Sequence, residues 1–449
     1  MEKYRSSSYN KYVPPIFKKL LPLALLITTV CSLVITITII RPFLPFTGYL
    51  LGQETPTSFI ILLQNDTELR ANGGFAGSYA KVSLSTKDTR PAINISFQDI
   101  YVPNGQLSGH VDPPAPIQEA FQHGTWELAN ADWEPDFPSA ASAIRWFLEK
   151  GGETNPDILV TLSLTTIKKV LNIVGPFKVK EFQAEITPQN IYSFLQSQAE
   201  TDFFPGSTQK KDALTAVGTA LWKKTTHLNP VQYLKIFSVI ADDLNHANML
   251  LHSSNPSFQK FLEAKGWAGK IIPGPHDNYL LVEANLGANK ANCCIDRLTD
   301  HTIFTENNTY RHRVHLSLTN TSSGHNPSPP FDFSGNYISF LRFYIPENAW
   351  GIEVSLNEST PSSQAFVPSK NTPQLSRKYG LTEIGFFHTT SSGTTSTVDL
   401  SYFLATGSAE KPYRLKLLKQ NGLVSSPQSI IFQGKTLHTL LTKTEDISL

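Results

Sequence analysis

The most constraining feature of this chain is an apolar run from Leu20 to Ile40 that contains no charged residue. A helix of that length rises about 31 Å, which matches the ~30 Å hydrocarbon core of a bilayer. Residues 1–19 carry five lysines and arginines against one acid, so the positive-inside rule predicts that this tail is cytoplasmic. The run ends without a small-x-small cleavage site, so we predict an uncleaved transmembrane signal anchor at 20–40, with a cleaved signal peptide as the alternative.

The composition indicates folded domains beyond this segment. Hydrophobic residues make up 40% of the chain and charged residues only 17%, which excludes a disordered chain or a coiled coil. The net charge is +1 and no basic face is visible, which argues against nucleic acid as the main partner. A length of 449 residues predicts two folded domains.

The pattern along the chain places those domains. Residues 41–57 carry three prolines and are predicted to be a linker. From 58 to 296, strand-like runs such as Ser58–Gln64 are interleaved with helical patterns such as Pro138–Lys150, which predicts an α/β domain with a mixed sheet flanked by helices. From 297 to 449, seven short alternating runs without helices predict an all-β, immunoglobulin-like sandwich.

The stretch "LRANGGFAGS" (69–78) places one arginine beside three glycines. It fits neither a Walker loop nor a dinucleotide-binding loop, and a strand-like run follows it, so no helix N-terminus is available for a phosphate. The glycines therefore indicate a tight turn or a close backbone approach. Arg70 ends an apolar strand, where it is either a bidentate ligand for phosphate or carboxylate or part of a structural ion pair.

Two charged clusters stand at helix entrances. Asp132, Glu134 and Asp136 precede a predicted helix, where they either hold Mg²⁺ or cap the helix and complement its dipole. Lys210 and Lys211 fall in the first turn of another predicted helix, where cations oppose the dipole. A bound anion would explain this placement, and we favour that interpretation over simple balance by neighbouring acids.

A polar stretch, "NLGANKANCCIDR", follows the predicted strand Asn278–Ala284. It is either a ligand-binding loop at the carboxyl end of a strand or a polar glycine turn. The binding candidates in it are Asn285, Asn289, Lys290, Asn292 and Arg297. The adjacent Cys293 and Cys294 are expected to be free, half-buried thiols, with a strained vicinal disulfide as the alternative.

Five stretches together carry a family resemblance. They are "LLQNDTELRANGGFAGS", "FQDIYVPNGQLSGHVDPPAPI", "ADWEPDFPSAASAIRWFLEK", "DFFPGSTQKKDAL" and "ANLGANKANCCIDR". They look like successive blocks of domain-of-unknown-function family 4012, a bacterial membrane-anchored group. More distantly, the α/β half resembles the LytR-CpsA-Psr phosphotransferases. The Arg-x-Asp-Thr motif of those enzymes is absent here, because Arg70 is followed by Ala71, Asn72 and Gly73.

The distant resemblance implies an extracytoplasmic protein of the bacterial envelope, anchored in the bilayer through 20–40, that transfers glycopolymer phosphate from a polyprenyl-pyrophosphate carrier to a cell-wall polymer. In that interpretation Arg70, Lys210 and Lys211 neutralise the pyrophosphate, and Mg²⁺ is held by Asp99, Asp132 or Asp136. The alternative, favoured by the altered phosphate-site residues, is a non-catalytic envelope module that binds glycan or a protein partner.

Overall fold

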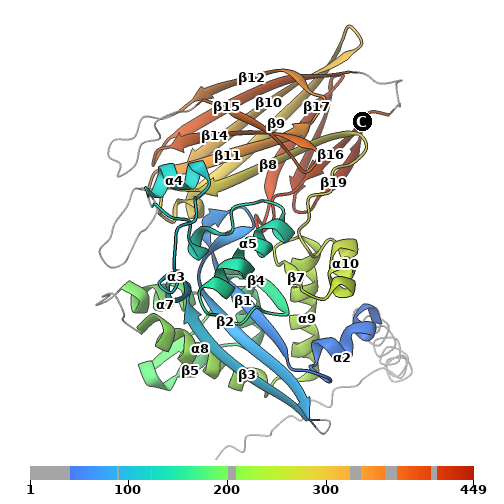
Figure 1. Cartoon of the computed structure of the whole chain (residues 1–449). Coiled ribbons are helices and arrows are strands. Elements are labelled where there is room, and N and C mark those ends of the chain that lie inside the picture. Colours follow the sequence, from blue (N-terminus) through green and yellow to red (C-terminus); the bar gives the residue numbers. More distant parts are fainter. Residues whose placement is uncertain are drawn as a thin grey trace, which may run out of the picture.

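The computed structural model describes residues 41–87, 90–122, 124–200, 209–323, 335–358, 372–405 and 412–449. The predicted cytoplasmic tail and signal anchor lie outside these residues. Among the residues described, no helix is both long and apolar enough to cross a bilayer. Figure 1 shows an α/β part, drawn in blue to green, stacked on a part made of strands, drawn in yellow to red.

The α/β part is built on a five-stranded sheet in the order β3-β2-β1-β4-β7. Its strands are β1 (Thr57–Arg70), β2 (Gly73–Lys87), β3 (Arg90–Asp99), β4 (Ile158–Ser163) and β7 (Leu251–Ser253). The central strand β1 pairs antiparallel with β2 and parallel with β4, so the sheet is mixed, as predicted.

Both faces of this sheet are covered, because alternate side chains of β1 pack into cores on opposite sides of it. Ile60 and Leu62 point into a core shared with helix α5 (Phe137–Lys150), whereas Phe59 and Ile61 pack into a second core with α10 (Pro256–Lys265). A strand covered on both faces has to be apolar throughout, which explains the continuous run in the sequence. Helices on both faces give the three layers of an α/β fold.

The remaining helices are α2 (Thr47–Leu50), α3 (Tyr101–Asn104), α4 (Ala115–Phe121), α6 (Leu164–Val174), α7 (Ile191–Glu200), α8 (Gln209–Thr225) and α9 (Pro230–Asn245). Of these, α6, α7, α8 and α9 lie where the sequence shows helical patterns, whereas α2, α3 and α4, like α10, were not predicted. Short 3-10 helices occupy Arg41–Phe46, Leu128–Asn130, Lys180–Phe182 and Ala291–Cys294, and a small hairpin joins β5 (Phe177–Val179) to β6 (Ala184–Ile186).

The predicted linker at 41–57 is largely folded. Residues Arg41–Phe46 and Thr47–Leu50 form short helices that pack against α10 and the residues after it. The rings of Phe43 and Trp267 stack with centroids 5.4 Å apart, and Phe46 lies 4.9 Å from Phe258. The aromatic residues between the prolines therefore anchor this segment to the domain, which the count of prolines did not reveal.

The second part is a sandwich of two six-stranded sheets, whereas the sequence predicted seven strands. One sheet has the order β12-β15-β10-β9-β17-β18 and the other β13-β14-β11-β8-β16-β19. The strands are β8 (Asp277–Asn285), β9 (Ile295–Glu306), β10 (Thr309–Asn320), β11 (Tyr337–Pro346), β12 (Trp350–Asn357), β13 (Gln374–Lys378), β14 (Leu381–Thr390), β15 (Thr395–Ala405), β16 (Arg414–Leu418), β17 (Ser426–Phe432), β18 (Lys435–Leu441) and β19 (Glu445–Ser448).

The core of the sandwich takes side chains from both sheets, among them Leu316 and Leu400 from one and Phe343 and Leu415 from the other. The outer face of the second sheet is covered by the α/β part, where Trp133 packs against Phe340. Strand β11 is consequently buried along its whole length. This covered face explains why its sequence does not alternate between apolar and polar residues.

The boundary between the two parts lies earlier than predicted. We expected it near 297 and assigned the strand Asn278–Ala284 to the α/β domain. In the structure this strand, β8, pairs with β11 and β16 of the sandwich. A single apolar strand does not reveal which sheet it will join, because its partners are far away in sequence.

The tip of the β1–β2 hairpin fixes the two parts to each other. Asn72 donates from Nδ2 to Asp132 Oδ1 and to the Glu134 carbonyl, both at 2.7 Å, and its Oδ1 accepts from Asn421 Nδ2 at 2.9 Å. Gly73 has a φ of +117° and lies against Gly422 of the sandwich. A Cβ added to Gly422 would lie only 2.2 Å from the Cα of Gly73. The glycines of "LRANGGFAGS" thus allow a close backbone approach, as predicted.

We expect Gly422→Ala to lower the thermal midpoint of the full chain far more than Gly434→Ala. Both glycines have a left-handed φ, of +72° and +79°, which costs an alanine about 1–2 kcal/mol. Only at Gly422 does the added methyl group meet another backbone, whereas nothing lies within 4 Å at Gly434. Differential scanning calorimetry measures both midpoints, and equal shifts would show that the hairpin tip is not tightly seated.

Candidate functional site

A pocket of about 580 Å³ lies between the sheet of the α/β part and helices α6, α7 and α8. We call it the helix pocket. One side is formed by β1 and β2, through Leu63, Phe75 and neighbouring residues. The facing side is formed by the three helices, which contribute Leu164, Ile167, Tyr192, Leu195 and Leu214. Its volume falls within the ~300–1,000 Å³ typical of ligand sites, and its walls are mainly apolar.

The charged residues of the helix pocket form two ion pairs. Lys210 Nζ lies 2.8 Å from Asp99 Oδ2 and also donates to the Gly77 carbonyl at 2.6 Å. Lys290 Nζ lies 3.5 Å from Glu68 Oε1. Lys210 and Asp99 remain 31% and 25% exposed, so their pair is worth about 0–1 kcal/mol and a stronger anion can displace it.

These contacts explain the lysines at the start of α8. Lys210 reaches across to the end of β3, where Asp99 and a backbone carbonyl offset its unfavourable position in the first helical turn. Lys211 is exposed and does not line the pocket. Of the two lysines predicted to bind an anion, the structure therefore places only Lys210 at a cavity.

Arg70 lies beneath the helix pocket rather than in it. Its side chain is buried, its Nη1 donates to the carbonyls of Asn285 and Leu69, and its guanidinium lies 5.2 Å from the ring centroid of Phe75. Burial lowers the pKa of the Arg70 guanidinium, although nearby Glu68 and Asp132 oppose this effect. Phe75, not Arg70, lines the cavity, and the hydrogen bonds of Arg70 go to carbonyls rather than to the carboxylate of an ion pair, so its role is structural in a different way from the ion pair that we considered.

Of the three acids predicted to bind Mg²⁺, Asp99 lines the helix pocket and pairs with Lys210, whereas Asp132 and Asp136 have structural contacts and do not line it. Asp136 accepts from the Ser139 amide and hydroxyl with Oδ2, capping α5, and from the Ile271 amide with Oδ1. Asp132 accepts from Asn72 through Oδ1, while its buried Oδ2 has no hydrogen-bond partner. Within the described part of the chain, no group of three or more histidine, cysteine or acidic side chains is arranged to hold a metal ion.

Most of the polar candidates after β8 build the junction between the two parts. Asn285 binds Asn289 and the Gly287 amide, which closes a glycine turn. Asn292 donates to the Asp66 carbonyl at 2.6 Å, and Arg297 forms a buried ion pair with Glu283 at 2.6 Å. Only Lys290 of this group lines the helix pocket.

The adjacent cysteines are joined. Cys293 and Cys294 form a vicinal disulfide at the end of the 3-10 helix Ala291–Cys294, rather than the free thiols that we expected. The spacing of two neighbouring cysteines does not by itself distinguish these two states. The bond lies just after Lys290 and immediately before β9, at the start of one sandwich sheet.

Comparison with known families supports the resemblance found in the sequence. Residues 54–199 match the family model described as "Protein of unknown function (DUF4012)". The match contains β1, β2, Arg70 and Asp132 but ends before Lys210, whereas the stretches that carry the resemblance in the sequence continue to Arg297. No curated protein sequence matches the chain.

Solved structures give weak similarities. The chain is similar to Bacillus subtilis TagV at 12% identity and a TM-score of 0.30, over 48% of this chain and 81% of that one. The Lin1025 protein from Listeria innocua gives 13% identity and a TM-score of 0.26, over 47% and 78%. The transcriptional regulator EF0465 from Enterococcus faecalis gives 9% and 0.27, over 48% and 72%. These scores are too low to support an argument about activity.

Sequence reasoning found three of the four charged residues of the helix pocket but missed Glu68 and the apolar walls. Asp99, Lys210 and Lys290 were among the predicted site residues, and all three line the cavity. Phe75 and Tyr101 and the apolar side chains of α6, α7 and α8 were not predicted. Leucines and isoleucines on a helix normally pack in a core. Whether they line a cavity instead depends on how far the helix lies from the sheet, which the sequence does not show.

Asp132→Asn is expected to change how stability depends on pH. Burial raises the pKa of the Asp132 carboxyl to about 6, with Asn72 and Arg70 opposing this shift. The folded wild-type protein therefore binds a proton more tightly than the unfolded chain, and loses up to about 3 kcal/mol of stability as the pH rises from 4 to above 6.

The asparagine variant has no carboxyl at this position and does not lose this stability as the pH rises. The difference in thermal midpoint, variant minus wild type, should therefore be larger at pH 8 than at pH 4.5. The exposed Asp296→Asn is the matched control, and its midpoint relative to the wild type should be the same at both pH values. A constant difference for Asp132→Asn as well would show that this carboxyl titrates normally.

Proposed function

We propose that the protein is an envelope module that binds the apolar chain of a lipid-linked glycan phosphate in the helix pocket. The observation that carries this proposal is a cavity of about 580 Å³ whose walls are mainly apolar and whose charged residues come from β1, the end of β3, the turn after β8 and the first turn of α8. A long hydrocarbon would be removed from water along these walls, at roughly 25 cal/mol per Å² of buried apolar area.

The polar groups of the pocket suit a headgroup that carries both phosphate and sugar. Lysine ammonium groups such as Lys210 bind phosphate as point charges. Carboxylates and amides, such as Asp99, Glu68 and Asn65, are suited to the hydroxyl groups of a sugar. A pocket with lysines and acids in equal number fits such a mixed headgroup better than a bare phosphate.

The proposal stops at binding and does not extend to phosphoryl transfer. Arg70, Asp132 and Asp136, which the transfer reaction would use, do not line the helix pocket. Catalysis of phosphoryl transfer depends on charge placed at the reacting oxygens. The two lysines that do line the pocket are each paired with an acid.

The proposal places this module outside the cytoplasmic membrane, anchored through 20–40. The vicinal disulfide at Cys293 and Cys294 supports that location, because disulfides persist mainly in oxidising compartments. A lipid carrier embedded in the same membrane would then be within reach of the pocket.

Binding of geranylgeranyl pyrophosphate to the full chain in lipid nanodiscs tests the proposal. Lys210→Met removes a cation from the pocket and should weaken binding by roughly tenfold, about 1.4 kcal/mol. Leu214→Trp fills the apolar part of the cavity and should weaken binding at least as much. Isothermal titration calorimetry measures both affinities.

The helix α8 also supplies matched controls. Lys211→Met removes the neighbouring exposed lysine, and Thr219→Trp adds the same bulk at an exposed position, so both should bind like the wild type. Removal of Mg²⁺ with EDTA should leave the affinity unchanged. Equal binding by Leu214→Trp and the wild type would contradict the proposed pocket, and turnover of the lipid would contradict a purely binding role.

A further inference from the structure

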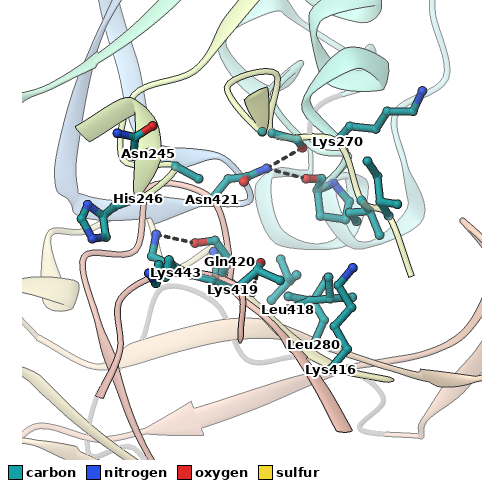
Figure 2. A pocket seen from close by; sticks show the side chains of 18 residues that line it. Asn245, His246, Lys270, Leu280, Lys416, Leu418, Lys419, Gln420, Asn421 and Lys443 are labelled. Atoms are coloured by element: carbon teal, nitrogen blue, oxygen red, sulfur yellow. Dashed lines mark hydrogen bonds between the residues drawn. The ribbon is translucent and has the colours of Figure 1, made fainter. Parts of the chain in front are cut away.

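A second cavity, of about 260 Å³, lies between the α/β part and the sandwich. We call it the junction pocket. The α/β part contributes the end of α9, around His246, and the segment Gly269–Ile272. The sandwich contributes residues of β8, β16 and the loops that follow β16 and β18. Figure 2 shows the labelled side chains of both parts around this cavity.

The junction pocket is lined by four lysines and one histidine, and no aspartate or glutamate is among its lining residues. Two of these groups have acidic partners elsewhere. Lys270 pairs with Glu263 at 2.8 Å and extends away from the other labelled side chains in Figure 2, and His246 lies 3.1 Å from Asp242. Three lysines remain, and among the described residues none of them makes an ion pair: Lys416, Lys419 and Lys443.

Lys419 is the most unusual of the three, because its side chain is buried. Its Nζ donates to Asn248 Oδ1 at 3.1 Å and to the Gln420 carbonyl at 3.2 Å, which are both neutral acceptors. An ammonium group has three protons to donate, and a buried charge without a counter-charge is costly. Burial lowers the pKa of the Lys419 ammonium to about 7, with Asp243 opposing this shift.

The other two lysines are more accessible. Lys416 lies on β16 opposite Asp446 of β19, although the two side chains make no ion pair, and Lys443 is exposed at the end of β18. Like charges gathered around one cavity repel each other, and a bound anion removes that repulsion. The remaining lining combines amides and a hydroxyl, from Asn245, Gln420 and Thr444, with apolar side chains of Leu280 and Leu418.

We propose that the junction pocket binds a small organic phosphate, attracted by the positive charge of Lys416 on one side of the cavity and of Lys419 and Lys443 on the other (Figure 2). The lysines act as point charges, which suit phosphate, whereas no arginine is available to form the planar fork that favours carboxylate. The cavity is larger than one phosphate ion needs, and its amides and hydroxyl are suited to the hydroxyl groups of an attached sugar. This site is separate from the helix pocket and does not depend on the function proposed for it.

Calorimetric titration of the full chain with glucose 1-phosphate tests this site, with glucose as the uncharged counterpart. The wild type should bind glucose 1-phosphate and not glucose. Lys416→Met and Lys443→Met should each weaken binding by about tenfold or more, because each removes a charge-assisted hydrogen bond. Both residues lie at accessible positions, so these variants should fold as the wild type does.

The controls distinguish this site from the rest of the surface and from the helix pocket. Lys435→Met removes an exposed lysine of β18, and Lys210→Met removes the lysine of the helix pocket, so both should bind glucose 1-phosphate like the wild type. Binding should also raise the thermal midpoint, because the ligand contacts both parts of the folded chain.

Three results would overturn the proposal. They are no binding by the wild type at millimolar glucose 1-phosphate, equal binding by Lys416→Met, Lys443→Met and the wild type, and loss of binding in Lys210→Met. The last result would assign the anion to the helix pocket, while the test of that pocket with the isoprenoid lipid would stand by itself.

Discussion

The arrangement of the α/β part and the sandwich depends on the contact of one hairpin tip, between β1 and β2, with the sandwich. Asn72 binds residues of both parts, and Gly73 and Gly422 bring two backbones into contact where no side chain fits. Beside them, Gln420 donates to the carbonyls of Arg70 and Glu283, so β1 and β8 are joined through one amide group. Buried, satisfied amide networks of this kind fix a single geometry, because each broken bond leaves an unpaired polar group.

The local structure was predictable because local patterns determine it. The first half of β1 is apolar because both its faces are buried, and α5 begins where Asp136 caps it and a proline follows at its start. The lysines at the start of α8 break a local rule, from which we predicted a bound anion, and the structure shows Lys210 paired with the acid Asp99 of β3. In each case the signal lay within a few residues of the element.

The functional geometry was only partly predictable, because it depends on which elements become neighbours. The residues next to Arg70 in the sequence do not indicate whether its side chain faces a ligand or a second domain. Only the position of β8, which joins the sandwich, shows that Arg70 donates to Asn285 across a buried junction. Likewise, Lys416, Lys419 and Lys443 show no pattern in the sequence, and they line one cavity because β16 and the segment after β18 lie against the end of α9.

The folded start of the described chain has a mechanical consequence. Phe43 and Phe46 are seated on α10 and the loop after it, so the segment from Arg41 to Leu50 is part of the rigid body. A flexible tether would let the domain rotate about each of its bonds, whereas the packing of this segment removes that freedom between Arg41 and Leu50. Any change in the orientation of the domain relative to the preceding chain therefore has to arise at or before Arg41.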